Sequence, residues 1–460
     1  MSKKVVVIGA GPAGYVCAIR LAQLGQSVTV VERDALGGVC LNVGCVPSKA
    51  LIAAGSLIDK ARKASTMGIS FGEPKVEIGK LVEWKQGIVA KLTGGVGSLL
   101  KNHGIKVVRG NATFADAKTL KVSGGSDGAQ SLTADVFVIA TGSVPIDIPG
   151  FKCDEKDVWS STGGLAPTRI PEHLVVIGGG YIGLELGSVW NRLGSKVTVL
   201  EALDRILPGM DQELSQLSQR AFTKQGIEFR LQSWVESAKV ENGKCIVRCK
   251  GAEPIESDRV LLATGRVPLT QNIGLENVGI ETDKRGFVPV DSNFQTKVPG
   301  IYALGDVIGG AMLAHKAMEE GVVCVERMQG IHSHFNYDCI PAIVYTHPEI
   351  ATVGKTEEQL KESGIGYKKG VGAYGANGRA RTLGEAEGRV KILADAKTDR
   401  VLGVHILGAR AGDLIAEASI AMEFGASSED IARSCHAHPT LAETIHEAAL
   451  AVDGRAIHSA

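Results

Sequence analysis

The N-terminal stretch reads Val5-Val6-Val7-Ile8-Gly9-Ala10-Gly11-Pro12-Ala13-Gly14, and a second stretch repeats it as Leu174-Val175-Val176-Ile177-Gly178-Gly179-Gly180-Tyr181-Ile182-Gly183. Each is an apolar strand followed by Gly-x-Gly-x-x-Gly and a helical pattern, and a second predicted strand follows at 27–32 and at 196–201. That second strand ends in Glu32 or Glu201, 23 residues after the first glycine in both copies. The pattern predicts two tandem, doubly wound α/β domains that bind dinucleotides.

The glycines and the two acids suggest how each loop would hold its ligand. Glycine lets backbone amides approach a pyrophosphate, and the N-terminus of the following helix carries partial positive charge. Glu32 and Glu201 would each accept a hydrogen bond from a ribose hydroxyl. A carboxylate at 201 also repels a 2′-phosphate, and only Arg205 lies nearby, so NAD is favoured over NADP. The alternative is that the glycines serve helix–strand packing alone.

Composition excludes several classes of protein. Glycine makes up 58 of the 460 residues, against roughly 7% in average proteins, but it follows no three-residue period. Acidic and basic residues balance at 50 each, which does not favour nucleic acid or anionic membrane as a partner. No uninterrupted apolar run approaches the roughly 18 residues of a membrane span. Because Met1-Ser2-Lys3-Lys4 runs straight into a strand, we expect no signal or transit peptide and a cytoplasmic location.

The two copies differ in length. Each closes with a further apolar strand, at 137–142 and at 260–265. From Gly9 to Thr141 is 132 residues, whereas from Gly178 to Thr264 is 86, so the first copy holds 46 more. Helical patterns at 48–63 and 80–102 fall in this longer copy. The surplus contains the cysteines at 40 and 45, so we expect chemistry to be inserted into one copy.

From about residue 341 the pattern changes to that of an α+β interface domain. Strands of a mostly antiparallel sheet are predicted at 349–354, 371–374, 389–394 and 401–407. Helices are predicted at 412–424 and 439–451, and Thr356 with Gln359 forms a plausible capping box. This region carries no nucleotide motif.

The hexapeptide Cys40-Leu41-Asn42-Val43-Gly44-Cys45 is the most informative short segment. Metal ligation would need further Cys or His nearby, and none is near in sequence. Buried structural cysteines would not need the company of Gly37, Gly38 and Gly44. A disulfide needs Cα atoms about 5.5 Å apart, and a regular helix does not bring residues i and i+5 together, so the backbone must be distorted here. Pro47 suits a first helical turn. We interpret the pair as a redox disulfide beside a dinucleotide-bound flavin.

The segment from Gly37 to Lys49 resembles the active-site signature of the flavin-dependent pyridine nucleotide-disulfide oxidoreductases, class I. The resemblance extends through the whole chain, and it is greatest to the dihydrolipoyl dehydrogenase branch of that family. It includes Ala303-Leu304-Gly305-Asp306-Val307, Met312-Leu313-Ala314-His315-Lys316 and His436-Ala437-His438-Pro439-Thr440-Leu441-Ala442-Glu443. Val39 departs from the threonine of many relatives.

The resemblance implies FAD and NAD as cofactors, no metal, and a homodimer. It divides the chain into an FAD-binding domain with the redox disulfide (1–145), an NAD-binding domain (146–270), a return segment completing the first domain (271–340) and a dimerisation domain (341–460). For FAD it implies Gly9, Gly11, Gly14, Glu32, Lys49, Thr141, Gly142, Ser143, Asp306, Met312, Ala314 and His315. For NAD it implies Gly178, Gly180, Tyr181, Ile182, Gly183, Glu185, Glu201 and Gly265.

The resemblance also implies roles in catalysis. Cys40 would meet the substrate and Cys45 would face the flavin, with Lys49 beside the flavin ring and paired with Glu185. His438 and Glu443 would be the acid–base dyad, reaching the disulfide from the neighbouring subunit. From the residues alone, Glu443 could equally be a capping acid of a helix that begins at Pro439. His436 is interpreted as structural. The cysteines outside the pair are interpreted as buried or incidental; they are Cys17, Cys153, Cys245, Cys249, Cys324, Cys339 and Cys435.

The expected activity is oxidation of protein-bound dihydrolipoyl groups with NAD⁺. The lipoyl-bearing partner would be an acyltransferase of a 2-oxo acid dehydrogenase complex or a glycine-cleavage carrier. A glutathione-type reductase would carry arginines where this chain has Ala202-Leu203-Asp204, and a mercuric-type reductase would carry a cysteine pair where it ends Arg455-Ala456-Ile457-His458-Ser459-Ala460. A subunit that serves mainly for docking would not need all of Cys40, Cys45, His438 and Glu443.

Overall fold

The computed structural model describes residues 2–146, 148, 151 and 153–458, and it divides into two compact units. The first consists of Met1–Leu51, Glu77–Asp147 and Gly265–Phe335; the second of Ile52–Val76, Ile148–Thr264 and Asn336–Ala460. The expectations that used Met1, Ser459 and Ala460 fall outside the described residues.

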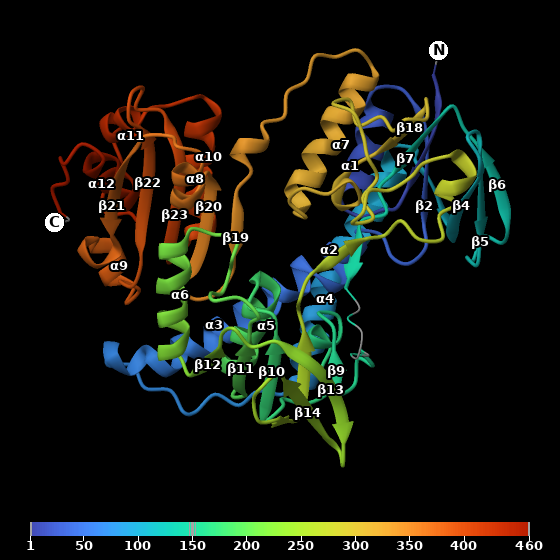
Figure 1. Cartoon of the computed structure of the whole chain (residues 1–460). Helices are drawn as coiled ribbons and strands as arrows, with labels where there is room; N and C mark the ends of the chain where they lie inside the picture. The colour runs from blue at the N-terminus through green and yellow to red at the C-terminus, as the bar shows by residue number, and fades with distance from the viewer. Residues whose placement is uncertain (1, 147, 149–150, 152, 459–460) are drawn as a thin grey trace. The chain divides into compact units, whose positions relative to one another are not determined.

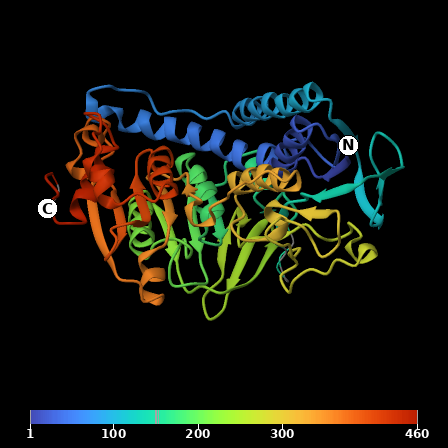
Figure 2. The same cartoon turned by 90° about the horizontal axis from the view of Figure 1, so that it is seen from above.

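The first unit is built on a five-stranded parallel sheet of order β18-β7-β1-β2-β3 (Figure 1). Its strands are β1 (Lys4–Ile8), β2 (Ser27–Glu32), β3 (Lys106–Arg109), β7 (Val136–Ile139) and β18 (Ile301–Ala303). The central strands are almost continuously apolar and buried, as expected for a sheet covered on both faces. Helices α1 (Pro12–Gln23) and α7 (Ala314–Met328) pack together, and α4 (Ile78–Asn102) is one unbroken helix, light blue in Figure 2.

The second unit contains the same sheet again, in the order β12-β11-β10-β16-β9. Its strands are β9 (Val158–Trp159), β10 (His173–Ile177), β11 (Lys196–Leu200), β12 (Ile227–Arg230) and β16 (Arg259–Leu262), and α5 (Tyr181–Arg192) follows β10. Each copy also carries a three-stranded antiparallel sheet before its closing strand, which sequence analysis did not predict. These are β4 (Asn111–Asp116), β5 (Thr119–Ser123) and β6 (Gln130–Thr133), and β13 (Val235–Glu241), β14 (Lys244–Cys249) and β15 (Ile255–Ser257). The tandem repeat is thus confirmed.

The surplus of the first copy is helical. Between β2 and α4 the chain forms α2 (Gly38–Val43), α3 (Cys45–Lys63) and a 3₁₀ turn, η1 (Ala64–Met67). The second copy passes from β11 to α6 (Gln212–Lys224) with no helix between them in the described residues. The cysteine pair therefore lies in an inserted helical segment, as predicted.

Residues 38–67 also have the length and composition of a membrane-spanning helix, with a mean hydropathy of 1.4 in the best window. Their backbone is interrupted at Gly44, and Asp59 Oδ2 in this segment pairs with Arg192 Nε at 2.9 Å. The second unit therefore holds the later part of this segment by a largely buried ion pair, which is unlike a lipid-exposed span.

The C-terminal domain is a five-stranded sheet of order β19-β20-β23-β22-β21, antiparallel throughout, as expected. Its strands are β19 (Ala342–Val344), β20 (Glu349–Gly354), β21 (Tyr367–Ala373), β22 (Arg389–Asp395) and β23 (Val401–Gly408). Helices α8 (Glu357–Glu362), α10 (Ala411–Glu423), α11 (Ser428–Arg433) and α12 (Glu443–Ala451) accompany it. The capping box of Thr356 and Gln359 at the start of α8 is confirmed.

The structure corrects the predicted start of one helix and adds a helix that was not predicted. The helix predicted from Pro439 begins only at Glu443, because the residues after the cis His438–Pro439 peptide form a turn in which Thr440 N–H bonds to Glu443. Helix α11 was not predicted, although Ser427 and Asp430 form a capping box at its start. At six residues it is too short to show a clear helical period.

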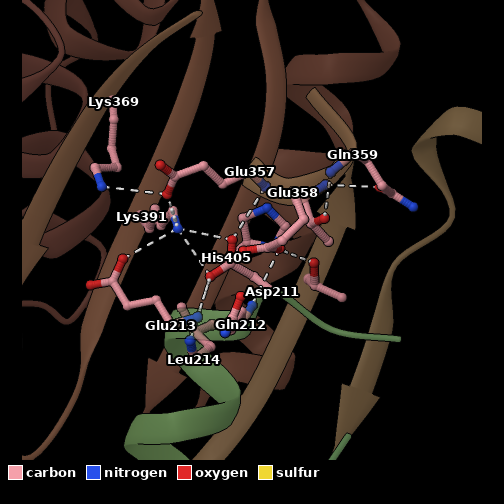
Figure 3. A network of polar contacts seen from close by, with 12 residues as sticks. Asp211, Gln212, Glu213, Leu214, Glu357, Glu358, Gln359, Lys369, Lys391 and His405 are labelled. Carbon is pink, nitrogen blue, oxygen red and sulfur yellow. Dashed lines mark hydrogen bonds and ion pairs between the residues drawn. The ribbon is translucent and has the colours of Figure 1, made fainter. Parts of the chain in front are cut away.

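A buried ionic cluster joins α6 to the C-terminal sheet within the second unit (Figure 3). Lys391 on β22 is fully buried, and its Nζ lies 2.9 Å from Asp211 Oδ2 and 2.5 Å from Glu357 Oε2. Asp211, also fully buried, caps α6 by accepting hydrogen bonds from Glu213 N and Leu214 N. Lys391 is thus the buried centre of the contacts that hold the start of α6 to the sheet, and Arg389 of β22 adds an ion pair with Glu213.

Candidate active site

The first and third glycines of each nucleotide loop are required by the protein's own packing. A Cβ at Gly9 would lie 2.4 Å from Ala140 O, and one at Gly178 would lie 2.5 Å from Ala263 O. A Cβ on the third glycine would lie 1.9 Å from Gly9 O in the first copy and 2.2 Å from Gly178 O in the second. Packing of the helix against the strand is therefore enough to explain why glycine stands at these four positions.

The middle glycines are not explained by packing. A Cβ at Gly180 would meet no protein atom within 4 Å, and one at Gly11 would meet only Gly38 Cα, at 4.0 Å. These residues begin α1 and α5, and neither helix has a side-chain cap on its N-terminal amides. The N-terminal amides of α1 and α5 therefore lie beside open space without a side-chain cap, which fits a bound pyrophosphate at both loops.

The two predicted ribose acids occupy equivalent places. Glu32 Oε2 accepts from Ala10 N at 2.7 Å and its Oε1 accepts from Asp34 N at 2.8 Å. Glu201 repeats this with Gly179 N at 2.7 Å and Leu203 N at 2.9 Å. Each carboxylate thus fixes its loop, and it keeps lone pairs for a ribose hydroxyl because a carboxylate accepts about four hydrogen bonds.

Asp306 lies in a fixed turn, η4 (Gly305–Ile308), that ends the first sheet. Ser143 Oγ donates to Asp306 Oδ2 at 2.5 Å, and Arg266 Nε donates to Ser143 Oγ at 2.7 Å. Thr141, just before them, donates from Oγ1 to Leu269 O at 2.7 Å. The structure therefore brings Thr141, Ser143 and Asp306 of the predicted flavin set to one end of the sheet.

Two positioning residues that sequence analysis did not assign support this turn from α7. Lys316 Nζ pairs with Glu320 Oε1 at 2.9 Å, and both side chains are buried. Lys316 also donates to Gly309 O, while Glu320 accepts from Gly305 N. Their i, i+4 spacing was visible in the sequence, but nothing in it showed that the pair is buried. Met312, Ala314 and His315 follow this turn at the start of α7.

The cysteine pair sits at a helix break next to the first nucleotide loop. Gly44 separates α2 from α3, and a Cβ there would lie 2.9 Å from Val39 O and 3.3 Å from Cys40 Cα. The close approach brings the side chains of Cys40 and Cys45 into hydrogen-bond contact. At the other end of α2, a Cβ on Gly38 would lie 2.6 Å from Gly11 Cα. The expected backbone distortion is confirmed.

The hydrogen bond from Cys45 and burial raise the pKa of Cys40 well above its ordinary value, whereas the nearby charge of Lys49 lowers it. Cys40 is half-buried and Cys45 is exposed. Of the remaining cysteines, Cys17, Cys245, Cys249 and Cys324 are buried, Cys153 and Cys339 are half-buried, and Cys435 is exposed.

His438 and Glu443 meet across the turn that precedes α12. His438 Nδ1 lies 2.8 Å from Glu443 Oε1, and Glu443 Oε2 accepts from Thr440 N at 2.7 Å. Burial alone would raise the pKa of Glu443, but the bonds from Thr440 and His438 outweigh it and lower that pKa. The His438 side chain is 79% exposed, so its Nε2 is open to a substrate.

Three of the remaining predicted NAD residues lie on α5. Tyr181 is exposed at the start of the helix, and Glu185 is buried one turn later and accepts from Tyr345 N at 2.9 Å. Ile182 lies between them on the helix, and Gly265 has a positive φ of 143° after β16. The pairing of Glu185 with Lys49 stays a prediction.

Known proteins match this chain over nearly its whole length. A model of the pyridine nucleotide-disulphide oxidoreductases matches residues 3–321, and one of their dimerisation domain matches residues 340–449. The mitochondrial dihydrolipoyl dehydrogenase of Homo sapiens is 47% identical over 465 residues, covering 99% of this chain and 91% of the relative. Dihydrolipoamide dehydrogenase of Chaetomium thermophilum is 47% identical over 469 residues, covering 99% and 92%. Among solved structures, LpdA of Mycobacterium tuberculosis superposes with a TM-score of 0.92 at 26% identity, covering 98% of this chain and 99% of that one.

Proposed function

Because the chain belongs to the pyridine nucleotide-disulphide oxidoreductase family, we propose that it oxidises dihydrolipoyl groups with NAD⁺ through its cysteine pair. Relatives named dihydrolipoyl dehydrogenase share 46% to 48% of their residues with it over nearly the whole chain. The observation that carries the proposal is the helix break at Gly44, which places Cys40 against Cys45 beside the first nucleotide loop.

FAD and NAD are the cofactors, and the two loops fit one dinucleotide each. Gly11 with the N-terminus of α1 would hold the FAD pyrophosphate, and Glu32 its ribose. Gly180 and Glu201 would do the same for NAD, whose unphosphorylated ribose suits a carboxylate. When bound, FAD supplies two-electron transfer between the thiol pair and NAD⁺.

His438 is placed to act as the base. Glu443 binds Nδ1, which fixes the ring and stabilises the imidazolium, so Nε2 can accept a proton from a substrate thiol. The resulting thiolate attacks Cys40 Sγ of the oxidised Cys40–Cys45 pair, and the bond to Cys45 breaks. The second substrate thiolate then displaces Cys40, which closes the lipoyl disulfide and leaves both cysteines reduced.

The proposal extends to assembly. The dimerisation-domain match supports a homodimer, in which His438 would serve the cysteine pair of the neighbouring subunit. The lipoyl group would be carried by an acyltransferase of a 2-oxo acid dehydrogenase complex or by a glycine-cleavage carrier. A cytoplasmic location stays a prediction from the sequence, and several relatives are named mitochondrial.

Steady-state kinetics test the proposal. We expect turnover of dihydrolipoamide with NAD⁺ to exceed that of glutathione disulfide with NADPH by orders of magnitude, and the reverse preference would refute the substrate assignment. Cys45→Ser should abolish dihydrolipoamide oxidation, whereas Cys435→Ser, which removes an exposed thiol outside the pair, should leave it unchanged. His438→Gln should lower kcat by about 10²- to 10⁴-fold while NADH still reduces dyes.

A further inference from the structure

A second histidine lies in the loop that carries His438. This loop, residues 434–442, joins α11 to α12. In its first part, residues 434–439, His436 is the only residue that is not exposed, and its side chain retains 9% of its accessible surface. His436 also stacks on His446 of α12, with ring centroids 5.0 Å apart. The first part of the loop is therefore held to the protein through His436, and its last part through the buried Leu441.

The hydrogen bonds of His436 require a proton on each ring nitrogen. Nδ1 lies 2.9 Å from Ser434 O, which can only accept a hydrogen bond. Nε2 lies 2.8 Å from Glu417 Oε1 on α10, and a carboxylate oxygen also only accepts. A neutral imidazole has one N–H and satisfies only one of these two acceptors, so the arrangement fits an imidazolium.

We propose that His436 is a positioning residue: as an imidazolium bound to Glu417 and Ser434, it holds the loop that presents His438 to the substrate. This inference rests on the proposed function of His438. Only Ala437 lies between His436 and His438 in sequence, so movement of the anchor shifts the His438 backbone directly. His436 itself does not touch the substrate.

The charged groups around the His436 ring also favour the imidazolium. Glu417 from α10 is the main cause that raises the pKa of His436; burial opposes it, and Ser434 O and the more distant Glu443 from α12 add to the rise. The neighbouring His446 donates from Nε2 to Ala432 O at 3.0 Å. A raised pKa means that the anchoring is complete below the ordinary histidine value of about 6.5 and is lost as pH rises through the higher value.

Variants at position 436 separate positioning from folding. His436→Ala should lower kcat for dihydrolipoamide oxidation about tenfold, with KM and the reduction of dyes by NADH unchanged. His436→Gln keeps two N–H groups but cannot titrate, so it should recover most of kcat and lose the alkaline fall in kcat that we expect of wild type. His458→Ala is the matched control, because His458 pairs with Glu447 of α12 but lies outside the loop, and its kcat should stay within twofold of wild type.

The protonation state is measured without turnover. Nitrogen-15 spectra of the holoenzyme, assigned with His436→Gln, should show His436 protonated on both nitrogens at pH 7. A neutral His436 ring, or a His436→Ala variant with the kcat and pH profile of wild type, would overturn the inference. If wild type does not oxidise dihydrolipoamide, the proposed function fails, while the ring measurement still decides the state of His436.

Discussion

Replacing Lys391 with methionine should sharply destabilise the second unit. Lys391 Nζ lies 2.9 Å from Asp211 Oδ2 and 2.5 Å from Glu357 Oε2, and its side chain has no accessible surface. At an effective dielectric constant of about 20, each attraction at such distances is worth about 6 kcal/mol. The variant regains the several kcal/mol spent on desolvating the ammonium, but it leaves Asp211 buried without a counter-charge. Removing one partner of a buried pair costs about 3–5 kcal/mol, which is the expected loss.

The assay is equilibrium urea unfolding of the holoenzyme, followed by tryptophan fluorescence. Trp159, Trp190 and Trp234 lie in the second unit, so three of the four tryptophans report on it. The matched control is Lys369→Met, which removes a 41% exposed cation that lies 3.4 Å from the same Glu357. Exposed pairs contribute about 0–1 kcal/mol, so this variant should unfold nearly as wild type does. A Lys391→Met protein no less stable than Lys369→Met would refute the reasoning.

The destabilisation should also shrink on acidification. Burial alone would raise the pKa of Asp211, but His405 and Lys391 outweigh this effect and lower that pKa. Burial would also raise the pKa of Glu357, but Lys391 and the other partners of Glu357 lower it. Carboxyls with lowered folded-state pKa values stabilise the fold above their unfolded values, near 4, and lose this as pH falls towards the folded values. Without Lys391, burial raises the pKa of Asp211, and protonation removes its unpaired charge, whereas Glu357 keeps its bonds from Tyr367 and Lys361. The difference between variant and wild type should therefore be smaller at pH 5 than at pH 7.

Two further substitutions test the site. Gly44→Ala places a Cβ 2.9 Å from a backbone carbonyl oxygen, so we expect dihydrolipoamide oxidation to fall at least tenfold, whereas Gly94→Ala, with nothing within 4 Å, should leave it unchanged; equal activities would show that the helix break does not need glycine. Glu201→Gln replaces one of the two accepting oxygens of Glu201 with an amide donor that faces Gly179 N or Leu203 N. The KM for NAD⁺ should therefore rise about tenfold or more, while the activity with NADP⁺ changes little or improves. An unchanged KM for NAD⁺ would contradict the role of Glu201.

Local patterns predicted much of this fold. The two Gly-x-Gly-x-x-Gly stretches, their spacing to Glu32 and Glu201, and the strand and helix periods depend on neighbouring residues, and the structure confirms them. The capping box at Thr356 was predictable for the same reason. The short antiparallel sheets β4–β6 and β13–β15 were missed although their signal was present, since buried residues alternate with less buried ones along β5 and β14. The start of α12 was placed four residues early because the turn after Pro439 is closed by Glu443.

The sequence by itself determined that two dinucleotide loops exist, that a cysteine pair is inserted into one copy, and which acid belongs to each loop. Only the tertiary structure decided which residues hold these parts in place. Lys316 with Glu320, Lys391 with Asp211, and His436 with Glu417 read in sequence as ordinary charged residues. Their roles follow from burial, because a charge that leaves water must find a partner, and chain folding alone decides which partner is there.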